Sequence, residues 1–393
     1  MLAGQYTMNF ELDDDQRAFQ NAARDFAAAE MAPFAARWDA EASFPRATLA
    51  HAGELGFCGL YASERAGGLG LPRLDSTIVL EELAAACPST TAYLSIHNMA
   101  TWMVTAFGQP EVVARWGPDL TQGRKLASYC LTEPEAGSDA ASLRTSARRD
   151  GEHYVIDGSK AFISGAGATE ALVVMARTGG EGAAGISAFL VPADAPGVRY
   201  GRKEDKLGWN SQPTRAIAFD DVRIPASHLL GAEGEGFRIA MKGLDGGRVN
   251  IAACSVGAAQ AALAAAQRHM NERRQFGRAL ATFQALQFKL ADMATDLVAA
   301  RQMVRLAASR LDAGAADATV YCAMAKRFAT DVGFQVCNDA LQIHGGYGYI
   351  REYPLERWLR DVRVHQILEG TNEIMRVIVA RRLLQDNATE ILR

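Results

Sequence analysis

The sequence predicts an α+β protein in which a β domain lies between two helical regions. Ala-rich helical runs occupy residues 1–125, and short β-branched or aromatic runs separated by Gly, Asp and Pro occupy residues 126–240. Long Ala-rich helical segments follow over residues 241–393. We therefore expect an N-terminal helical domain, a middle β domain and a C-terminal four-helix bundle with these boundaries.

In the first region, Asp13 or Asp14 can cap a helix through DDDQRAFQNAARDFAAAEM that ends before Pro33. Further helices are expected at EELAAAC and over residues 91–107, and the glycine-rich ERAGGLGLP is a loop.

The middle region contains the strand-like runs YVIDGSKAFIS, ALVVMAR, ISAFLVP and RAIAFDDVRIP, which predict mainly antiparallel strands joined by turns. Gly180, Gly182 and Gly185 also fit the G-x-G-x-x-G pattern of dinucleotide-binding proteins. That pattern must open a helix, whereas here a strand follows directly. We interpret these glycines as a hairpin loop.

The third region contains VNIAACSVGAAQAALAAAQRHMNERRQF and FQALQFKLADMATDLVAARQMVRLAASRLDAG, both much longer than the average globular helix. Long helices rich in small residues pack closely, as in a bundle.

Composition excludes several functional classes. The 393 residues are 49% hydrophobic and carry a formal net charge of −4, which does not favour nucleic acid as the main partner. The 6 Cys and 7 His are scattered without paired spacings, so we expect reduced thiols and no metal site.

The N-terminus, MLAGQYTMNFELDDDQ, has neither the pattern of a signal peptide nor that of a mitochondrial presequence. No run of about 18 apolar residues is apparent. We therefore expect a cytoplasmic protein with no membrane span.

One candidate catalytic residue lies in VHQILEGTNEIMR. Glu369 follows the apolar pair Ile367-Leu368 and precedes Gly370, which a helix interior would disfavour by about 1 kcal/mol. A carboxylate beside apolar side chains loses solvation, which raises its pKa toward the range of a general base. The alternative is an ordinary glutamate at the end of a helix.

A second candidate is YCLTEPEAGSDAASL, a strand followed by a loop of small residues. The loop can offer backbone N–H groups and the hydroxyls of Thr132 and Ser138 to a phosphate or to the edge of an isoalloxazine. A plain turn capped by Ser138 and Asp139 is the alternative.

These two stretches, with KAFISGAG, ERRQFG and QIHGGYGY in the same order, resemble the acyl-CoA dehydrogenase flavoprotein family over nearly the whole chain. With LGWNSQPTRA, they are most similar to members acting on short branched-chain substrates. The resemblance implies FAD as cofactor, and Glu369 as the base that removes the α-proton of an acyl thioester while a β-hydride passes to flavin N5. It also implies that the Glu369 backbone N–H and a flavin hydroxyl polarise the thioester carbonyl.

The resemblance implies a larger set of site residues. Contacts to the flavin and pyrophosphate are expected from Tyr129, Cys130, Leu131, Thr132, Ser138, Phe162, Ile163, Ser164, Thr371, Asn372 and Glu373, although many relatives have Gln in place of Glu373. Contacts to the adenine half, across a subunit boundary, are expected from Arg273, Phe283, Gln284, Gln342, Ile343, His344, Gly345 and Gly346. Substrate contacts are expected from Ser138, Asp245, Gly246, Gly247, Arg248 and Arg381. Without the family resemblance, Arg273 would be interpreted as an ordinary surface residue at a helix end, and Arg381 as a cation favoured near a helix C-terminus.

The expected reaction is oxidation of isobutyryl-CoA to methacrylyl-CoA, because straight-chain relatives commonly have Tyr where this chain has Leu368, and an aliphatic side chain leaves room for a branch. Electron-transferring flavoprotein is the implied electron acceptor, and a homotetramer centred on the long helices is the implied assembly. The alternatives are a butyryl- or 2-methylbutyryl-CoA dehydrogenase, an acyl-CoA oxidase, and a DNA-associated or assembly protein of the same fold.

Overall fold

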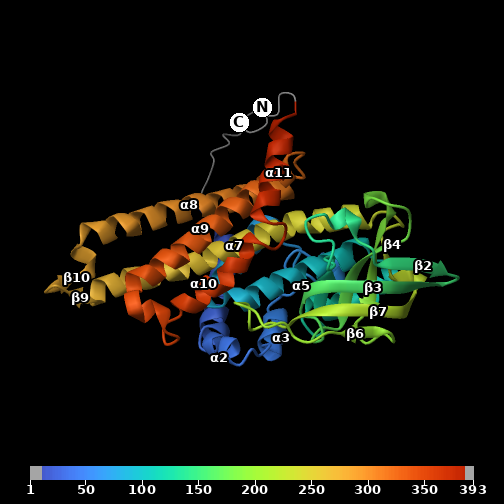
Figure 1. Cartoon of the computed structure of the whole chain (residues 1–393), viewed down its shortest axis with the longest axis horizontal. Coiled ribbons are helices and arrows are strands. Elements are labelled where there is room, and N and C mark those ends of the chain that lie inside the picture. Colours follow the sequence, from blue (N-terminus) through green and yellow to red (C-terminus); the bar gives the residue numbers. More distant parts are fainter. Residues whose placement is uncertain (1–10, 386–393) are drawn as a thin grey trace.

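Three long helices pack together as the central bundle of the molecule. The computed structural model describes residues 11–385, and in it these helices run side by side. The longest of them extends from the β sheet at one end to the small hairpin of β9 (Arg274–Gln275) and β10 (Arg278–Ala279) at the other (Figure 1). Their facing sides are rich in buried alanine, which lets the helices pack closely. They are α7 (Gly236–Glu272), α8 (Gln284–Asp312) and α9 (Ala318–His344).

The N-terminal helices cover the bundle and one face of the sheet. Asp13 caps the first helix in a capping box, accepting from the backbone N–H of Gln16 at 2.8 Å while the Gln16 side chain accepts from the Asp13 N–H at 3.2 Å. The π-helix Ala27–Met31 continues this helix toward Pro33. The helices are α1 (Asp14–Phe26), α2 (Ala35–Ala40), α3 (Arg46–Glu54), α4 (Arg73–Ala86), α5 (Pro88–Phe107) and α6 (Pro110–Thr121).

The middle of the chain forms an eight-stranded sheet in the order β6-β7-β3-β2-β4-β5-β8, with β1 paired to β4. Its strands pair antiparallel except for β1 with β4 and a single parallel bridge of β2 with β4. Gly180, Gly182 and Gly185 lie in the β4–β5 hairpin, which confirms the interpretation of this glycine pattern as a turn. The strands are β1 (Ala127–Cys130), β2 (Ser146–Asp150), β3 (His153–Ser164), β4 (Ala171–Arg177), β5 (Ile186–Pro192), β6 (Val198–Tyr200), β7 (Thr214–Pro225) and β8 (Leu229–Leu230), with β9 (Arg274–Gln275) and β10 (Arg278–Ala279) apart from them.

The sheet is buried on both faces. One face packs with α5, α6 and the beginning of α7, and the other has an apolar core of its own. Helix α5 therefore lies between the sheet and the bundle and contacts both (Figure 1).

The chain ends in two shorter helices, α10 (Leu355–Arg363) and α11 (Asn372–Leu383), joined by the 3₁₀ turn Val364–Gln366 and a loop that contains Glu369. Helix α7 begins at Gly236, so the change from strand to helix comes a few residues before the expected position 241. The ends of the sequence, including the first ten residues on which the localisation prediction depends, lie outside the described range.

The expectation that no segment is apolar enough to span a membrane needs a correction. Within the described residues, helix α7 meets that criterion by length and composition, with a mean hydropathy of 1.5 over an 18-residue window. Because 78% of this window is buried inside the protein, α7 is accounted for as a core helix. All six cysteines are buried free thiols.

Candidate functional site

Glu369 lies at a sharp turn rather than in a helix. Its φ of +55° is in the left-handed region, which non-glycine residues rarely adopt, and Gly370 follows with φ of +86°. Thr371 then caps α11 by accepting a hydrogen bond from the Ile374 N–H at 3.3 Å. The two left-handed residues reverse the chain so that the Glu369 carboxyl points back toward α7.

The Glu369 carboxyl is desolvated. Its Oε2 atom is buried and has no hydrogen-bond partner in the described part of the protein. Burial raises the pKa of Glu369 to about 7, against the opposing charges of Arg248 and Lys326. The raised pKa agrees with the interpretation of this carboxyl, but of the apolar pair before it only Leu368 packs in the adjoining cluster, while Ile367 is 51% exposed. A carboxyl with this pKa can exchange a proton near neutral pH.

Gly247 makes room for this carboxyl. A Cβ atom on Gly247 would lie 2.5 Å from Glu369 Oε2, too close for any real contact. The DGGR segment, expected to approach substrate, therefore lies inside α7, and one of its glycines faces the candidate base.

Arg248 is also engaged within the protein. It is buried, its Nη1 donates to Asp245 Oδ1 at 2.6 Å, and its Nε donates to the Glu369 carbonyl at 3.4 Å. Asp245 in turn accepts from the Thr319 hydroxyl at 2.6 Å. The structure thus places Asp245 and Arg248 where they hold the backbone of Glu369, whereas the sequence suggested contacts to the substrate.

Three polar side chains that the sequence analysis missed lie in the surroundings of Glu369: Tyr61, Arg73 and Lys326. The Arg73 guanidinium lies 3.4 Å from the centre of the Tyr61 ring, beside Gly246, and its Nη1 is buried without a partner. The third, Lys326, is fully buried in α9. No sequence pattern marks these residues, because they come from a loop and two helices that meet only in the folded chain.

An apolar wall flanks the candidate base. Leu368 packs against Ile96, Ile251 and Trp209, with Tyr129 at the same cluster. Among the residues that the structure describes, the buried Tyr129 hydroxyl has no hydrogen-bond partner, so this cluster contains one unsatisfied polar atom.

Trp209, from the LGWNSQPTRA stretch, is fixed in this wall. Its backbone N–H donates to Asp361 Oδ1 at 2.7 Å, and its indole N–H donates to His365 Nε2 at 3.3 Å. His365 Nε2 must therefore be the acceptor, which leaves its Nδ1–H to donate to the Ser255 hydroxyl at 2.7 Å. Burial lowers the pKa of His365 to about 3, so the ring is neutral and its tautomer is set.

The predicted flavin segments lie side by side at one end of the sheet, where β1 and β3 end. Tyr129 and Cys130 end β1, Leu131 and Thr132 follow, and the Ala161 N–H donates to the Thr132 carbonyl at 2.9 Å. Phe162 sits at a register shift in the β3–β7 ladder, with φ of +58° and 71% of its surface exposed. Such a bulge re-aims one side chain, and here it turns an aromatic ring outward while Ile163 remains buried.

A buried ion pair holds these segments together. Lys160 Nζ donates to Glu133 Oε1 at 2.8 Å and to the Leu131 carbonyl at 3.0 Å. Glu133 also accepts from the backbone N–H groups of Arg144 at 2.6 Å and Thr145 at 2.9 Å. The pair anchors the loop that carries Ser138, which is exposed.

The surroundings of this end of the sheet fit a flavin. Both amide atoms of Gln212 are buried without partners, two residues before Thr214, which pairs with Ser164 in the ladder. Gly137, beside Ser138, faces open space. The unsatisfied Gln212 amide and the exposed Phe162 ring suit a polar planar ring system, and the open loop at Gly137 has room for a phosphate.

A second group of predicted residues lies at the far end of α7. Arg273, Ile343, His344, Gly345 and Gly346 line a pocket of about 500 Å³ beside β9 and β10. The Arg273 guanidinium lies 5.4 Å from the centre of the Tyr347 ring. Roughly 26 helical residues separate Gly247 from Arg273, so about 39 Å lie between the two groups.

The remaining predicted residues have varied surroundings. Phe283 and Gln284 begin α8, Gln342 lies near the end of α9, and Glu373 is exposed in the first turn of α11. The Asn372 side chain is buried and bonded to Thr330 and Asp331 of α9. Arg381 is exposed in the last turn of α11, where a cation is favoured.

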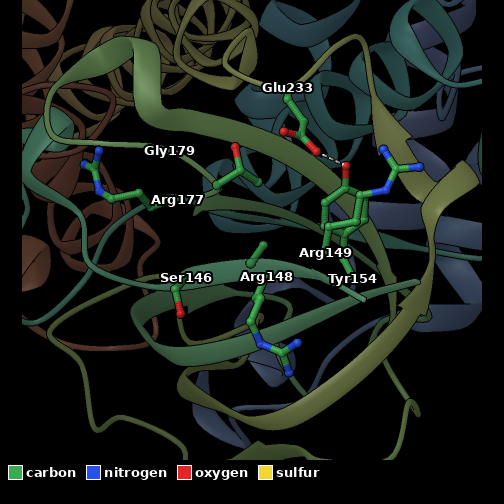
Figure 2. Close-up of a pocket in the computed structure, with 9 residues that line it drawn as sticks. Ser146, Arg148, Arg149, Tyr154, Arg177, Gly179 and Glu233 are labelled. Carbon is green, nitrogen blue, oxygen red and sulfur yellow. Dashed lines mark hydrogen bonds between the residues drawn. The ribbon is translucent and has the colours of Figure 1, made fainter. Parts of the chain in front are cut away.

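A further pocket contains none of the predicted residues. It has a volume of about 330 Å³ and lies where β2 and β4 diverge (Figure 2). Its Arg177 guanidinium is already bonded to backbone carbonyls, including those of Ala141 and Leu143, and Tyr154 donates to Glu233. We assign it no part in the chemistry.

Comparison with known proteins identifies the class. The N-terminal, middle and C-terminal domains of acyl-CoA dehydrogenase match residues 13–124, 128–222 and 234–384. The chain therefore belongs to the acyl-CoA dehydrogenase family and is an oxidoreductase acting on acyl-CoA, as the sequence motifs predicted.

The similarity extends to particular members. The chain is 54% identical to mitochondrial isobutyryl-CoA dehydrogenase of Dictyostelium discoideum, covering 96% of this chain and 91% of that protein. It is also 54% identical to the Bos taurus enzyme of the same name, covering 95% and 90%. The solved structure of butyryl-CoA dehydrogenase from Megasphaera elsdenii superimposes with a TM-score of 0.93 at 39% identity, covering 96% of this chain and all of that one.

Proposed function

We propose that this protein oxidises isobutyryl-CoA to methacrylyl-CoA, a step of valine degradation, with FAD as cofactor. The identity to two isobutyryl-CoA dehydrogenases over nearly the whole chain supports this substrate. The wall formed by Leu368, Ile96 and Ile251 supports a short branched acyl group, because an aliphatic side chain stands directly before the base.

The observation that carries the proposal is the buried, unpartnered Oε2 of Glu369, whose pKa is raised to about 7. In the proposed reaction this oxygen takes the α-proton, the electron pair of the α-C–H bond forms the double bond, and hydride leaves the β-carbon. FAD, when bound, supplies the acceptor for that hydride. A base with this pKa is deprotonated in a useful fraction at neutral pH and still holds the proton that it receives.

The backbone at Glu369 can activate the thioester. Among the residues that the structure describes, no acceptor bonds the Glu369 N–H. This N–H is available to the substrate carbonyl, where it would stabilise the negative charge that develops as the α-proton leaves. Arg248 donates to the carbonyl of Glu369 and so holds the next peptide group, Glu369–Gly370, which limits movement of the chain beside this N–H.

The wide separation of the two groups of predicted flavin residues supports a second subunit at the site. A distance of about 39 Å along α7 is long for one dinucleotide, which favours contact of Arg273 with the FAD of a neighbouring subunit rather than with that of its own chain. We therefore assign Arg273 and its pocket to the adenine half of a neighbouring subunit's FAD, in a homotetramer. The exposed Phe288, Val298 and Leu306 on α8 support such an assembly, because they form an apolar surface for another copy.

Electron-transferring flavoprotein is the proposed acceptor and the cytoplasm the proposed location. Steady-state kinetics with that acceptor or an artificial dye test the substrate assignment. We expect a higher kcat/KM for isobutyryl-CoA than for butyryl-CoA or 2-methylbutyryl-CoA. Better turnover of either competitor would refute isobutyryl-CoA as the substrate, although the protein would remain a dehydrogenase.

A further inference from the structure

Lys326 is a buried lysine directly behind the candidate base. It lies in the interior of α9 with none of its surface exposed. Its Nζ donates to the Gly370 carbonyl at 2.8 Å and to Asn372 Oδ1 at 2.8 Å. The two acceptors lie one and three residues after Glu369, so Lys326 grips the chain where it leaves the base.

Asn372 completes this grip. Its Nδ2 donates to the Thr330 hydroxyl at 2.9 Å and to Asp331 Oδ1 at 2.8 Å, both on α9. The segment that follows the base is thus bound to α9 by the Lys326 ammonium and the Asn372 amide. The amide oxygen accepts from Lys326, and the amide nitrogen donates to α9.

The turn that this network holds is unfavourable by itself. A non-glycine residue in the left-handed region is strained and persists only where the surrounding structure determines it. Glu369 is such a residue. Arg248 of α7 donates to the Glu369 carbonyl and Lys326 of α9 donates to the Gly370 carbonyl, so two helices hold the turn.

Lys326 also acts on the carboxyl through charge. The charged groups around its ammonium are Glu369, Arg248 of α7, Asp331 of α9 and Glu373 of α11, and the neutral ring of His365 lies nearby. Burial lowers the pKa of Lys326 to about 7, while Glu369 favours its charged form. The ammonium in turn favours the carboxylate form of Glu369.

We propose that Lys326 is a positioning residue for the dehydrogenation: it holds the turn that aims Glu369, and its ammonium favours the carboxylate form of that residue. This inference rests on the proposed role of Glu369 as base. Without the ammonium, the carboxyl retains its burial but loses a stabilising charge, so a larger fraction is protonated at pH 7 and cannot accept the α-proton.

The test uses the FAD-loaded enzyme with Lys326→Gln, which keeps a hydrogen-bond donor but removes the charge. Flavin reduction by isobutyryl-CoA is followed by stopped-flow absorbance from pH 6 to 10. We expect the rate at pH 7 to fall about tenfold or more, the acid limb to move up by about one pH unit, and the dissociation constant of the acyl-CoA to change by less than about threefold. Lys289→Met is the matched control, because it removes a lysine whose ion pair with Asp339 joins α8 to α9 away from the base.

Stability gives a second readout. The loss of thermal stability caused by Lys326→Gln at pH 7 should be smaller when Glu369 is already Gln, because the interaction between the Lys326 ammonium and the Glu369 carboxylate is then already absent. A normal rate and pH profile in Lys326→Gln, or additive stability changes in the double variant, would overturn the inference. If Glu369→Gln itself reduced flavin normally, the proposed function would fall instead.

Discussion

Replacing Glu369 by Gln should stabilise the protein at alkaline pH while abolishing its chemistry. The substitution keeps the size and the left-handed backbone of the residue, and it resembles the protonated carboxyl. In the native enzyme the buried carboxyl must ionise as the pH rises, although its Oε2 atom has no partner. The variant avoids this ionisation.

The size of the effect follows from the pKa of Glu369, which is raised from an ordinary value of 4.5 to about 7. A raised pKa means that the stability contributed by the protonated group is fully present below 4.5 and is lost as the pH rises through 7. Each pKa unit corresponds to about 1.4 kcal/mol. The variant should therefore exceed the native enzyme in free energy of unfolding by about 1.4 kcal/mol at pH 5.5 and by about 3 kcal/mol at pH 8.5.

Urea unfolding followed by circular dichroism measures this difference. Protein concentration and excess FAD are held fixed at every pH, because both contribute to apparent stability by mass action. The reasoning fails if the gap between the two proteins is independent of pH, or if the variant is the less stable one at pH 8.5.

Three further substitutions test other parts of the site. Arg273→Ala should lower flavin retention and loosen the oligomer, with thermal stability recovering in excess FAD; unchanged flavin content and melting temperature after gel filtration would contradict the intersubunit assignment. Gly247→Ala should slow flavin reduction at least about tenfold, because its Cβ would lie 2.5 Å from Glu369 Oε2. Gly180→Ala is the control, because a Cβ at that position would meet open space. Equal rates in the two variants would refute the packing argument. Leu368→Tyr should reduce kcat/KM for isobutyryl-CoA more than for butyryl-CoA, by a factor within the roughly 10–200-fold attributed to one methyl group, and an equal loss on both substrates would disprove a role in branch recognition.

Much of the fold was predictable because its signals are local. The change from Ala-rich helical runs to short β-branched strands is visible in the sequence, and the strand after Gly185 was sufficient to identify the hairpin. The desolvated carboxyl was also predictable, since the apolar neighbours and the following glycine are adjacent to it in the chain.

The surroundings of that carboxyl were not predictable in the same way. Gly247, Arg248 and Lys326 are far from Glu369 in sequence, and each takes its role from packing between helices. A glycine inside a helix gives no sign of which side chain will occupy the space it leaves. Nor does a sequence show that Glu369 packs against α7 at Gly247, many turns along that helix from Arg273.

The most direct test of the central claim is anaerobic mixing of the FAD-loaded enzyme with isobutyryl-CoA in a stopped-flow spectrophotometer. The native enzyme should lose its flavin absorbance in a rapid single turnover whose rate falls as the pH drops below about 7, the pKa of Glu369. Glu369→Gln should bind the same thioester and keep its flavin oxidised. Flavin reduction at a near-native rate in that variant would contradict the assignment of Glu369 as the base.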